Sequence, residues 1–305
     1  MKFISDIVGK PLEWINSLTG NFALSVVLFL VLCKFMLSFL TYFKSTKVVR
    51  TQLAKPFLFK IKEKFLGKDN EKFQNGSLKI FSITKTSQFS TTWPTIVELF
   101  FLFPILTVLY NPITYVFKGL SGQIDVLYEK AANIVSAGLS KEIDIINAIR
   151  TNPTTFADVD IEPILNMNTN IFGFDVFKPA DINGSSIILP ILMVLFFIYR
   201  TIKLVVPVLR KKVRLRRVVL PLSLNIIICS SMSVAALTLP MIFYLYFVVF
   251  AIVGLIGEKV INTIIMKKYK NWVKEANAKC QEVLLDLGVE EKVSAIVEKE
   301  EHENG

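Results

Sequence analysis

The chain has 305 residues, of which 52% are hydrophobic and only 20% are charged, and its net charge is +10. Its mean hydropathy is +0.52. A soluble domain carries about a quarter charged residues and lacks apolar runs near 20 residues, so a soluble enzyme and a disordered chain are both excluded. Three distant cysteines argue against a disulfide framework. With one histidine, His302, and no CxxC motif, we expect no metal site and no cofactor.

Five apolar stretches are long enough to cross a membrane. A bilayer core of about 30 Å requires roughly 20 residues of helix at 1.5 Å per residue. The stretches cover about 22–43, 96–117, 186–206, 218–237 and 241–264. Only a short turn around Pro240 separates the last two, which predicts a helical hairpin. The expected fold class is therefore all-α, a polytopic membrane protein with five transmembrane helices.

The basic residues predict the orientation of these spans. Segment 44–90 contains eleven Lys or Arg residues against three acidic ones, and the link RKKVRLRR at 210–217 adds six basic residues and no acid. Segment 111–190 has five basic and nine acidic residues. The excess of positive charge in cytoplasmic loops then places the two basic segments and the C-terminus in the cytoplasm and the N-terminus outside. The RKKVRLRR link is also a candidate contact for anionic lipids.

Three segments outside the spans have helical patterns. The first 18 residues lack the apolar core of a cleavable signal peptide, and their periodicity predicts an amphipathic helix on the outer leaflet. In the basic segment, apolar residues recur every four positions before the turn 67–70, which predicts an antiparallel helical hairpin. The outer segment contains an amphipathic stretch, 124–149. The apolar residues of the two repeating patterns are Phe3, Ile4, Ile7, Val8, Leu12, Trp14, Ile15 and Leu18, then Val49, Leu53, Phe57, Ile61 and Phe65.

These patterns divide the chain into nine parts. The parts are the outer-face amphipathic helix 1–20, the first span 21–43, the cytoplasmic basic hairpin 44–92, the second span 93–117, the extracytoplasmic segment 118–185, the third span 186–206, the basic link 207–217, the fourth and fifth spans 218–264, and the cytoplasmic tail 265–305.

Lys34 is the most informative residue, because it lies about 15 Å from the cytoplasmic boundary near Lys44, close to the middle of the bilayer. A lysine there costs about 2.5–3.5 kcal/mol on insertion scales, and such charges normally face a bundle interior or a hydrated cavity. One interpretation is a hydrophilic groove that ends at Lys34, with Glu98 as its electrostatic neighbour. The alternative is a structural Lys–Glu pair with serines that pack helices. The other groove candidates are Ser223, Asn225, Ser230 and Tyr246.

Several motifs in this order resemble one family. The segment PLEWINSLTGNFALSVV is followed by Lys34 at a position where that family usually has arginine, and LAKPFLFKIKEKFLGKDNEK follows as the hairpin. The lead-in FGFDVFKPADINGSSIILPIL and the spacing of Pro240, Tyr246 and Phe247 also agree. Over about residues 10–265 the chain resembles the YidC-type membrane protein insertases, relatives of the mitochondrial Oxa and chloroplast Alb insertases. It departs from them in Lys34, in Glu98 where glutamine is common, and in its acidic end.

The resemblance implies a bacterial plasma-membrane insertase and chaperone, not an enzyme, with no catalytic residue. It would move client proteins into the bilayer through a groove open to the cytoplasm that contains the positive charge of Lys34. The implied partners are nascent membrane proteins, with the ribosome, the signal recognition particle system and the Sec translocon as candidates, and no DNA.

Two other functions stay open at this point. A small-solute transporter or channel could use a Lys34–Glu98 pair, although the inverted repeats typical of many transporters are not evident. A pure assembly scaffold would use its polar groups only to hold helices together.

Overall fold

The computed structural model describes residues 2–86, 92–134, 140–181, 184–209 and 238–289, together with 219, 222–223, 226–227 and 230–231. Helices dominate these residues, which confirms the expected all-α class. Three helical segments among them are long and apolar enough to cross a membrane: Phe22–Phe65, Ser185–Lys203 and Met241–Asp286. A shorter apolar helix covers Phe100–Tyr110. Most of the expected fourth span, 218–237, lies outside the described residues.

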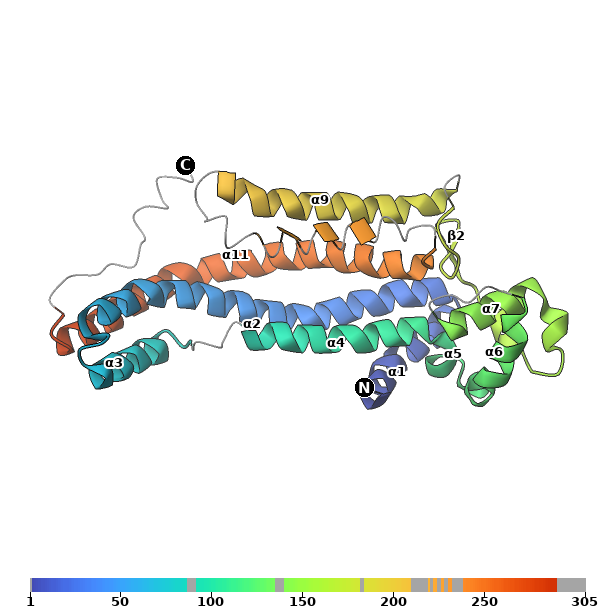
Figure 1. Cartoon of the computed structure of the whole chain (residues 1–305), viewed down its shortest axis with the longest axis horizontal. Helices are drawn as coiled ribbons and strands as arrows, with labels where there is room; N and C mark the ends of the chain where they lie inside the picture. Colours follow the sequence, from blue (N-terminus) through green and yellow to red (C-terminus); the bar gives the residue numbers. More distant parts are fainter. Residues whose placement is uncertain are drawn as a thin grey trace. The chain divides into compact units, whose positions relative to one another are not determined.

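The chain divides into two compact units. Unit 1 contains Met1–Lys34 and Phe101–Gly254, and unit 2 contains Phe35–Phe100 and Leu255–Gly305. The helices α2 (Phe22–Phe65) and α11 (Met241–Asp286) contribute residues to both units, and they are the longest helices of the described chain (Figure 1). The other apolar helices are α4 (Thr92–Tyr110) and α9 (Ile188–Leu209), which follows the short helix η3 (Ser185–Ile187).

In unit 1, helix α1 (Lys2–Thr19) buries one face and exposes the other. The buried face contains Ser5, Gly9 and Leu12. A Cβ on Gly9 would lie only 2.9 Å from the ring of Tyr115 in α5 (Pro112–Tyr115). The opposite face leaves apolar side chains exposed at positions that share one side of a 3.6-residue helix. These exposed side chains are Phe3, Ile7, Trp14 and Leu18.

The expected second span is shorter than the sequence indicated. A single helix over 96–117 is wrong, because α4 ends at Tyr110 and a separate short helix begins at Pro112. Asn111 has a non-helical backbone (φ −125°, ψ 62°), as expected for a residue that precedes proline. Pro104 lies inside α4 without ending it, which membrane helices tolerate.

Residues 112–134 and 140–181 form a small globular segment of unit 1, in which the expected amphipathic stretch 124–149 contributes two helices, α6 and α7. Two residues with positive φ, Phe172 and Gly173, form the tight turn between its paired strands, a turn that glycine favours. The strands pair antiparallel, with Asn170 opposite Asp175 and Ile171 opposite Phe174. After α5 the elements are η1 (Lys118–Gln123), α6 (Ile124–Ala132), α7 (Lys141–Thr151), η2 (Pro153–Phe156), α8 (Glu162–Leu165), β1 (Asn170–Ile171) and β2 (Phe174–Asp175).

Unit 2 contains the C-terminal part of α2, helix α3 (Asn70–Ile83), the first residues of α4 and the C-terminal part of α11. Gly67 adopts φ +79° in the turn between the first two, and Asp69 caps α3 by accepting a hydrogen bond from the backbone N–H of Lys72. The apolar stripe of α2 is buried against α3 and α11. The buried cluster contains Leu53, Ala54, Phe57, Ile61, Phe65, Ile80, Val273, Ala276, Cys280, Val283, Leu284 and Val289.

The end of α11 is therefore part of unit 2, although the sequence indicated a span ending near 264 followed by a separate tail. Arg50 of α2 stacks on the ring of Trp272 at 4.5 Å, and Lys64 donates a hydrogen bond to the carbonyl of Gly288. Gly76 of α3 packs so closely that a Cβ there would lie 2.7 Å from Leu287. What the sequence presents as a two-helix hairpin is a three-helix bundle.

Candidate functional site

Lys34 lies in an uninterrupted part of α2, twelve residues after its first residue, Phe22. At 1.5 Å per residue it is about 18 Å from that end of the helix. Leu30 and Leu37, on either side of it along the same face, are buried, whereas Phe35 and Met36 are exposed. The side chain of Lys34 is half-buried. Its stem therefore starts at the edge of the packed face of α2.

One face of α11 receives the Lys34 side chain within unit 1. The ammonium lies over the ring of Phe250, with Nζ 5.3 Å from the ring centroid. Phe250 in turn stacks against Tyr246 with 4.5 Å between ring centroids. One turn further along, a Cβ on Gly254 would lie 3.3 Å from Lys34 Cε and 4.0 Å from Nζ. Residues 246, 250 and 254 recur every four positions, so an aromatic pair and a glycine form one stripe toward Lys34.

The strand region of the globular segment sets the depth at which these residues meet. The Phe22 N–H at the start of α2 donates to the Asn168 carbonyl at 2.8 Å, and the Ile242 N–H at the start of α11 donates to the Val176 carbonyl at 2.7 Å. Both helices therefore begin at the same level and run in the same direction. Phe250 and Gly254, nine and thirteen residues after Met241, lie about 14 and 20 Å along α11, which brackets Lys34 at about 18 Å.

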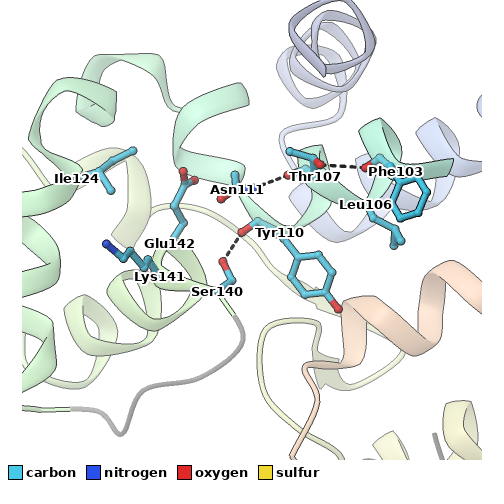
Figure 2. A pocket seen from close by; sticks show the side chains of 9 residues that line it. All are labelled: Phe103, Leu106, Thr107, Tyr110, Asn111, Ile124, Ser140, Lys141 and Glu142. Carbon is cyan, nitrogen blue, oxygen red and sulfur yellow. Dashed lines mark hydrogen bonds between the residues drawn. The ribbon is translucent and has the colours of Figure 1, made fainter. Parts of the chain in front are cut away.

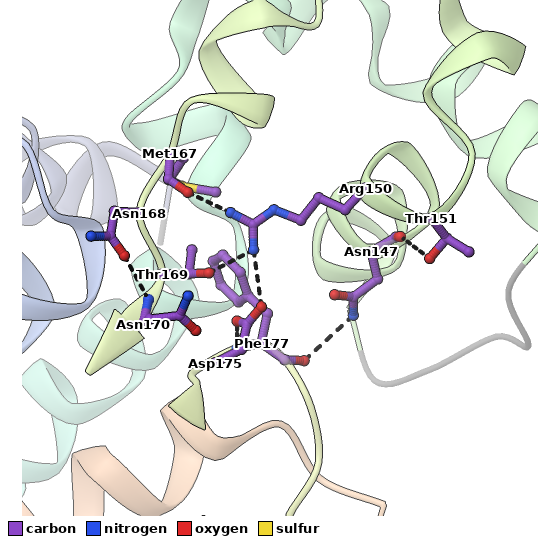
Figure 3. A network of polar contacts seen from close by, with 9 residues as sticks. All are labelled: Asn147, Arg150, Thr151, Met167, Asn168, Thr169, Asn170, Asp175 and Phe177. Atoms are coloured by element: carbon purple, nitrogen blue, oxygen red, sulfur yellow. Dashed lines mark hydrogen bonds and ion pairs between the residues drawn. The ribbon is translucent and has the colours of Figure 1, made fainter. Parts of the chain in front are cut away.

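A network of polar side chains around Arg150 holds this strand region in place (Figure 3). Arg150 of α7 donates to the Thr169 hydroxyl at 2.5 Å, to the Met167 carbonyl at 2.6 Å and to the Asp175 carboxylate at 3.1 Å. Its side chain is 21% exposed and that of Asp175 is 15% exposed. Such a largely buried, hydrogen-bonded pair tolerates poorly the loss of either partner. We infer that this network supports the Lys34 site indirectly, through the starts of α2 and α11.

The ring face of Phe250 stabilises the positive charge of Lys34. A ring face attracts a cation electrostatically and is worth about 0.5–1 kcal/mol when exposed and about 2 kcal/mol when desolvated. The Phe250 ring is therefore one of the groups that stabilise the Lys34 ammonium in unit 1.

The structure assembles only part of the predicted site. Tyr246 is buried and belongs to the same stripe as Phe250. Ser223 and Ser230 are exposed, and the Ser230 hydroxyl donates to the Ile226 carbonyl at 2.9 Å, the backbone bond typical of a serine inside a helix. Glu98 belongs to α4 but its side chain lies outside the described residues, as does Asn225 altogether.

Phe250 and Gly254 were missed because each is unremarkable in an apolar span. The available signal was their spacing: they follow Tyr246, a predicted groove residue, at four-residue intervals. Within the described part of the chain, no group of three His, Cys, Asp or Glu residues could hold a metal ion.

One family matches most of the chain, and the similar relatives match about a third of it. The family described as 60Kd inner membrane protein matches residues 14–271. A protein titled Membrane protein insertase YidC from Brucella suis is 27% identical over 108 residues, which is 35% of this chain and 18% of the relative. One with the same title from Caldanaerobacter subterraneus is 25% identical over 109 residues, 36% of this chain and 52% of the relative. The matches thus span about a fifth to a half of these relatives. No solved structure matches.

Proposed function

The chain belongs to the 60Kd inner membrane protein family, a family of multi-pass bacterial membrane proteins, and we propose on this premise that it is a membrane protein insertase. The observation that carries the proposal is the ammonium of Lys34, placed inside an apolar helix and held against the face of Phe250. A cation this deep is costly and is normally functional. In an insertase it would attract the acidic, translocated tail of a client.

The mechanism we propose uses no nucleotide. A client's polar tail would enter a hydrophilic groove lined by Lys34, Glu98, Ser223, Asn225 and Ser230, and its acidic residues would bind transiently near the Lys34 ammonium. The client's apolar segment would then leave sideways into lipid. At about 25 cal/mol per Å² of buried apolar surface, transfer of that helix into the bilayer supplies the driving force. Nascent membrane proteins are the proposed clients, and the ribosome, the signal recognition particle system and the Sec translocon stay predictions.

Reconstituted vesicles containing the full chain test this function. The client is a single-pass protein with an acidic N-terminal tail, and a second client has the same tail with Asn and Gln in place of Asp and Glu. Lys34→Met, which keeps the length of the side chain, should lower insertion of the acidic-tail client severalfold and affect the neutral one less. Lys34→Arg should retain activity. Lys44→Met, the same change ten residues along the helix, is the matched control.

Two results would overturn the proposal. If Lys34→Met inserts both clients as well as the wild type does, the charge of Lys34 has no role in insertion. Absence of insertion together with a solute flux that depends on Lys34 would instead favour a transporter. Both results are read from the same vesicles, with protection of the client tail from protease as the measure of insertion.

The orientation is part of the proposal. We place the N-terminus and the globular segment outside and the C-terminus in the cytoplasm, because the basic segments lie between the first two spans and in the link 210–217. Single cysteines are placed at Lys10 and at Lys270 in a chain without its own cysteines. With an impermeant reagent, the cysteine at position 10 should react in intact cells, and the one at position 270 should react only after the cells are opened. Labelling of both from outside would contradict it.

A further inference from the structure

A cavity of about 480 Å³ lies in unit 1 where α4 ends and where α6 and α7 begin. Its volume is within the range of small-ligand sites, about 300–1,000 Å³. Figure 2 shows side chains from α4 on one side of it and side chains from the start of α7 on the other. The residues that line it are Phe103, Leu106, Thr107, Tyr110, Asn111, Ile124, Ser140, Lys141 and Glu142.

The wall contributed by α4 is mostly apolar, and the expected second span places it within the membrane. Phe103, Leu106 and Tyr110 all lie in the apolar helix Phe100–Tyr110. The Phe103 side chain is 55% exposed, and an exposed phenylalanine on a membrane helix contacts acyl chains. The helix ends at Tyr110, and Tyr is enriched at the level of the lipid headgroups. The cavity therefore lies at the boundary between hydrocarbon and water.

The opposite wall carries one charge of each sign. Lys141 is exposed, and its ammonium lies 4.9 Å from the centroid of the Tyr128 ring, which limits its freedom. Glu142 is only 4% exposed and accepts hydrogen bonds from the backbone N–H of Thr114 at 3.0 Å and from its hydroxyl at 2.5 Å. A carboxylate has about four lone-pair sites, so Glu142 can accept further donors.

These features match the parts of one kind of molecule. We propose that the cavity binds a phospholipid whose headgroup carries both a phosphate and a primary ammonium, as in phosphatidylethanolamine. The phosphate pairs with Lys141, the lipid ammonium pairs with Glu142, and the acyl chains lie along Phe103 and Leu106. The bound lipid anchors the globular segment to the surface of the bilayer, and this role does not depend on the insertase activity.

Charge complementarity favours this lipid over an anionic one. A phosphate alone would meet Lys141 but would also lie close to the Glu142 carboxylate, and like charges in a partly buried site repel. A headgroup with an added ammonium satisfies both protein charges at once. A diacylglycerol would use only the apolar wall.

Lipid titrations of the full-length protein, followed by native mass spectrometry, test the proposal. Wild type should retain one phosphatidylethanolamine with an affinity severalfold higher than for phosphatidylglycerol of the same acyl chains. Glu142→Gln should abolish this preference, and Lys141→Met should weaken binding of both lipids about fivefold. The controls Glu129→Gln on α6 and Lys178→Met, which lie outside the cavity, should behave as wild type.

A second variant tests the cavity without altering its charges. Ile124→Trp fills the space between α4 and α7 and should remove the single tight site for both phospholipids while leaving weaker, non-specific lipid binding unchanged. The proposal is overturned if Glu142→Gln keeps the preference, if Ile124→Trp keeps the tight site, or if diacylglycerol binds as tightly as phosphatidylethanolamine.

Discussion

Gly254 is the position where a small change should move the Lys34 ammonium without removing it. Gly254→Ala places a Cβ 3.3 Å from Lys34 Cε, slightly closer than ordinary van der Waals contact, so a shift of a few tenths of an ångström in the flexible lysine stem accommodates it. Gly254→Val adds methyl groups that reach about 1.5 Å further. We expect these methyl groups to displace the ammonium from the Phe250 ring.

The size of the effect follows from the contact that is lost. A cation–π interaction of about 0.5–2 kcal/mol corresponds to a factor of roughly 2 to 30 in the population of the correctly placed ammonium. The helix itself should not suffer, because replacing glycine inside a helix by alanine is favourable by about 1 kcal/mol. A loss of insertion activity should therefore not be accompanied by a loss of thermal stability. This result would distinguish a misplaced ammonium from a misfolded protein.

The assay is the initial rate of insertion of the acidic-tail client into vesicles. Gly254→Ala should stay within about twofold of wild type, and Gly254→Val should approach the rate of Lys34→Met, by the cation–π range above. Gly257→Val is the matched control, because a Cβ at that position in α11 would meet the hydroxyl of Ser38 at 3.2 Å, not a cation. A wild-type rate for Gly254→Val, or an equal loss for Gly257→Val, would refute the reasoning.

Four further changes have defined outcomes. Phe250→Leu should slow insertion of the acidic-tail client two- to tenfold while Phe250→Trp retains the rate, because only the latter keeps a ring under the ammonium. Arg150→Ala should destabilise the globular segment by about 3 kcal/mol, measured by hydrogen exchange at β1 and β2, because it leaves the Asp175 carboxylate unpaired. Phe57→Ala should cost about 3–5 kcal/mol and speed exchange in α3 and in the parts of α2 and α11 that form the buried cluster, since Phe57 is fully buried there. Burial raises the pKa of Glu142, so the folded state binds this proton more tightly than the unfolded state; the midpoint of thermal unfolding should rise as pH falls from neutral towards about 4.5, and Glu142→Gln should flatten this dependence.

The local patterns of the sequence were sufficient for much of the architecture. Apolar length alone indicated the helices that the structure describes as α2, α9 and α11, and the four-residue apolar stripe before Gly67 lies on the buried face of α2 in unit 2. The family indicated by the motifs around Lys34 is confirmed. These features are short-range or compositional, because helix periodicity and membrane insertion depend on residues within about 20 positions of each other.

Other expectations failed where distant contacts or local breaks decide the outcome. The sequence indicated a two-helix cytoplasmic hairpin, but the apolar face of α11 beyond residue 264 packs on these two helices and forms a three-helix bundle with them. The expected second span took Pro112 as tolerated inside a membrane helix, but the helix breaks at Asn111, the residue before that proline. The Lys34–Glu98 pair stays a prediction, since the Glu98 side chain lies outside the described residues.

The sequence by itself determined that this is a mostly helical membrane protein with one cation well inside its first apolar helix, because hydrophobic length and charge are properties of the residues alone. Only the tertiary structure decided which groups surround that cation and how the two walls of the cavity at the end of α4 meet. Phe250 and Gly254 lie more than 200 residues from Lys34 in the chain. The backbone N–H groups at the starts of α2 and α11 donate hydrogen bonds to carbonyls of residues 168–178, which brings Phe250 and Gly254 level with Lys34, and such non-local register is not encoded in any short segment.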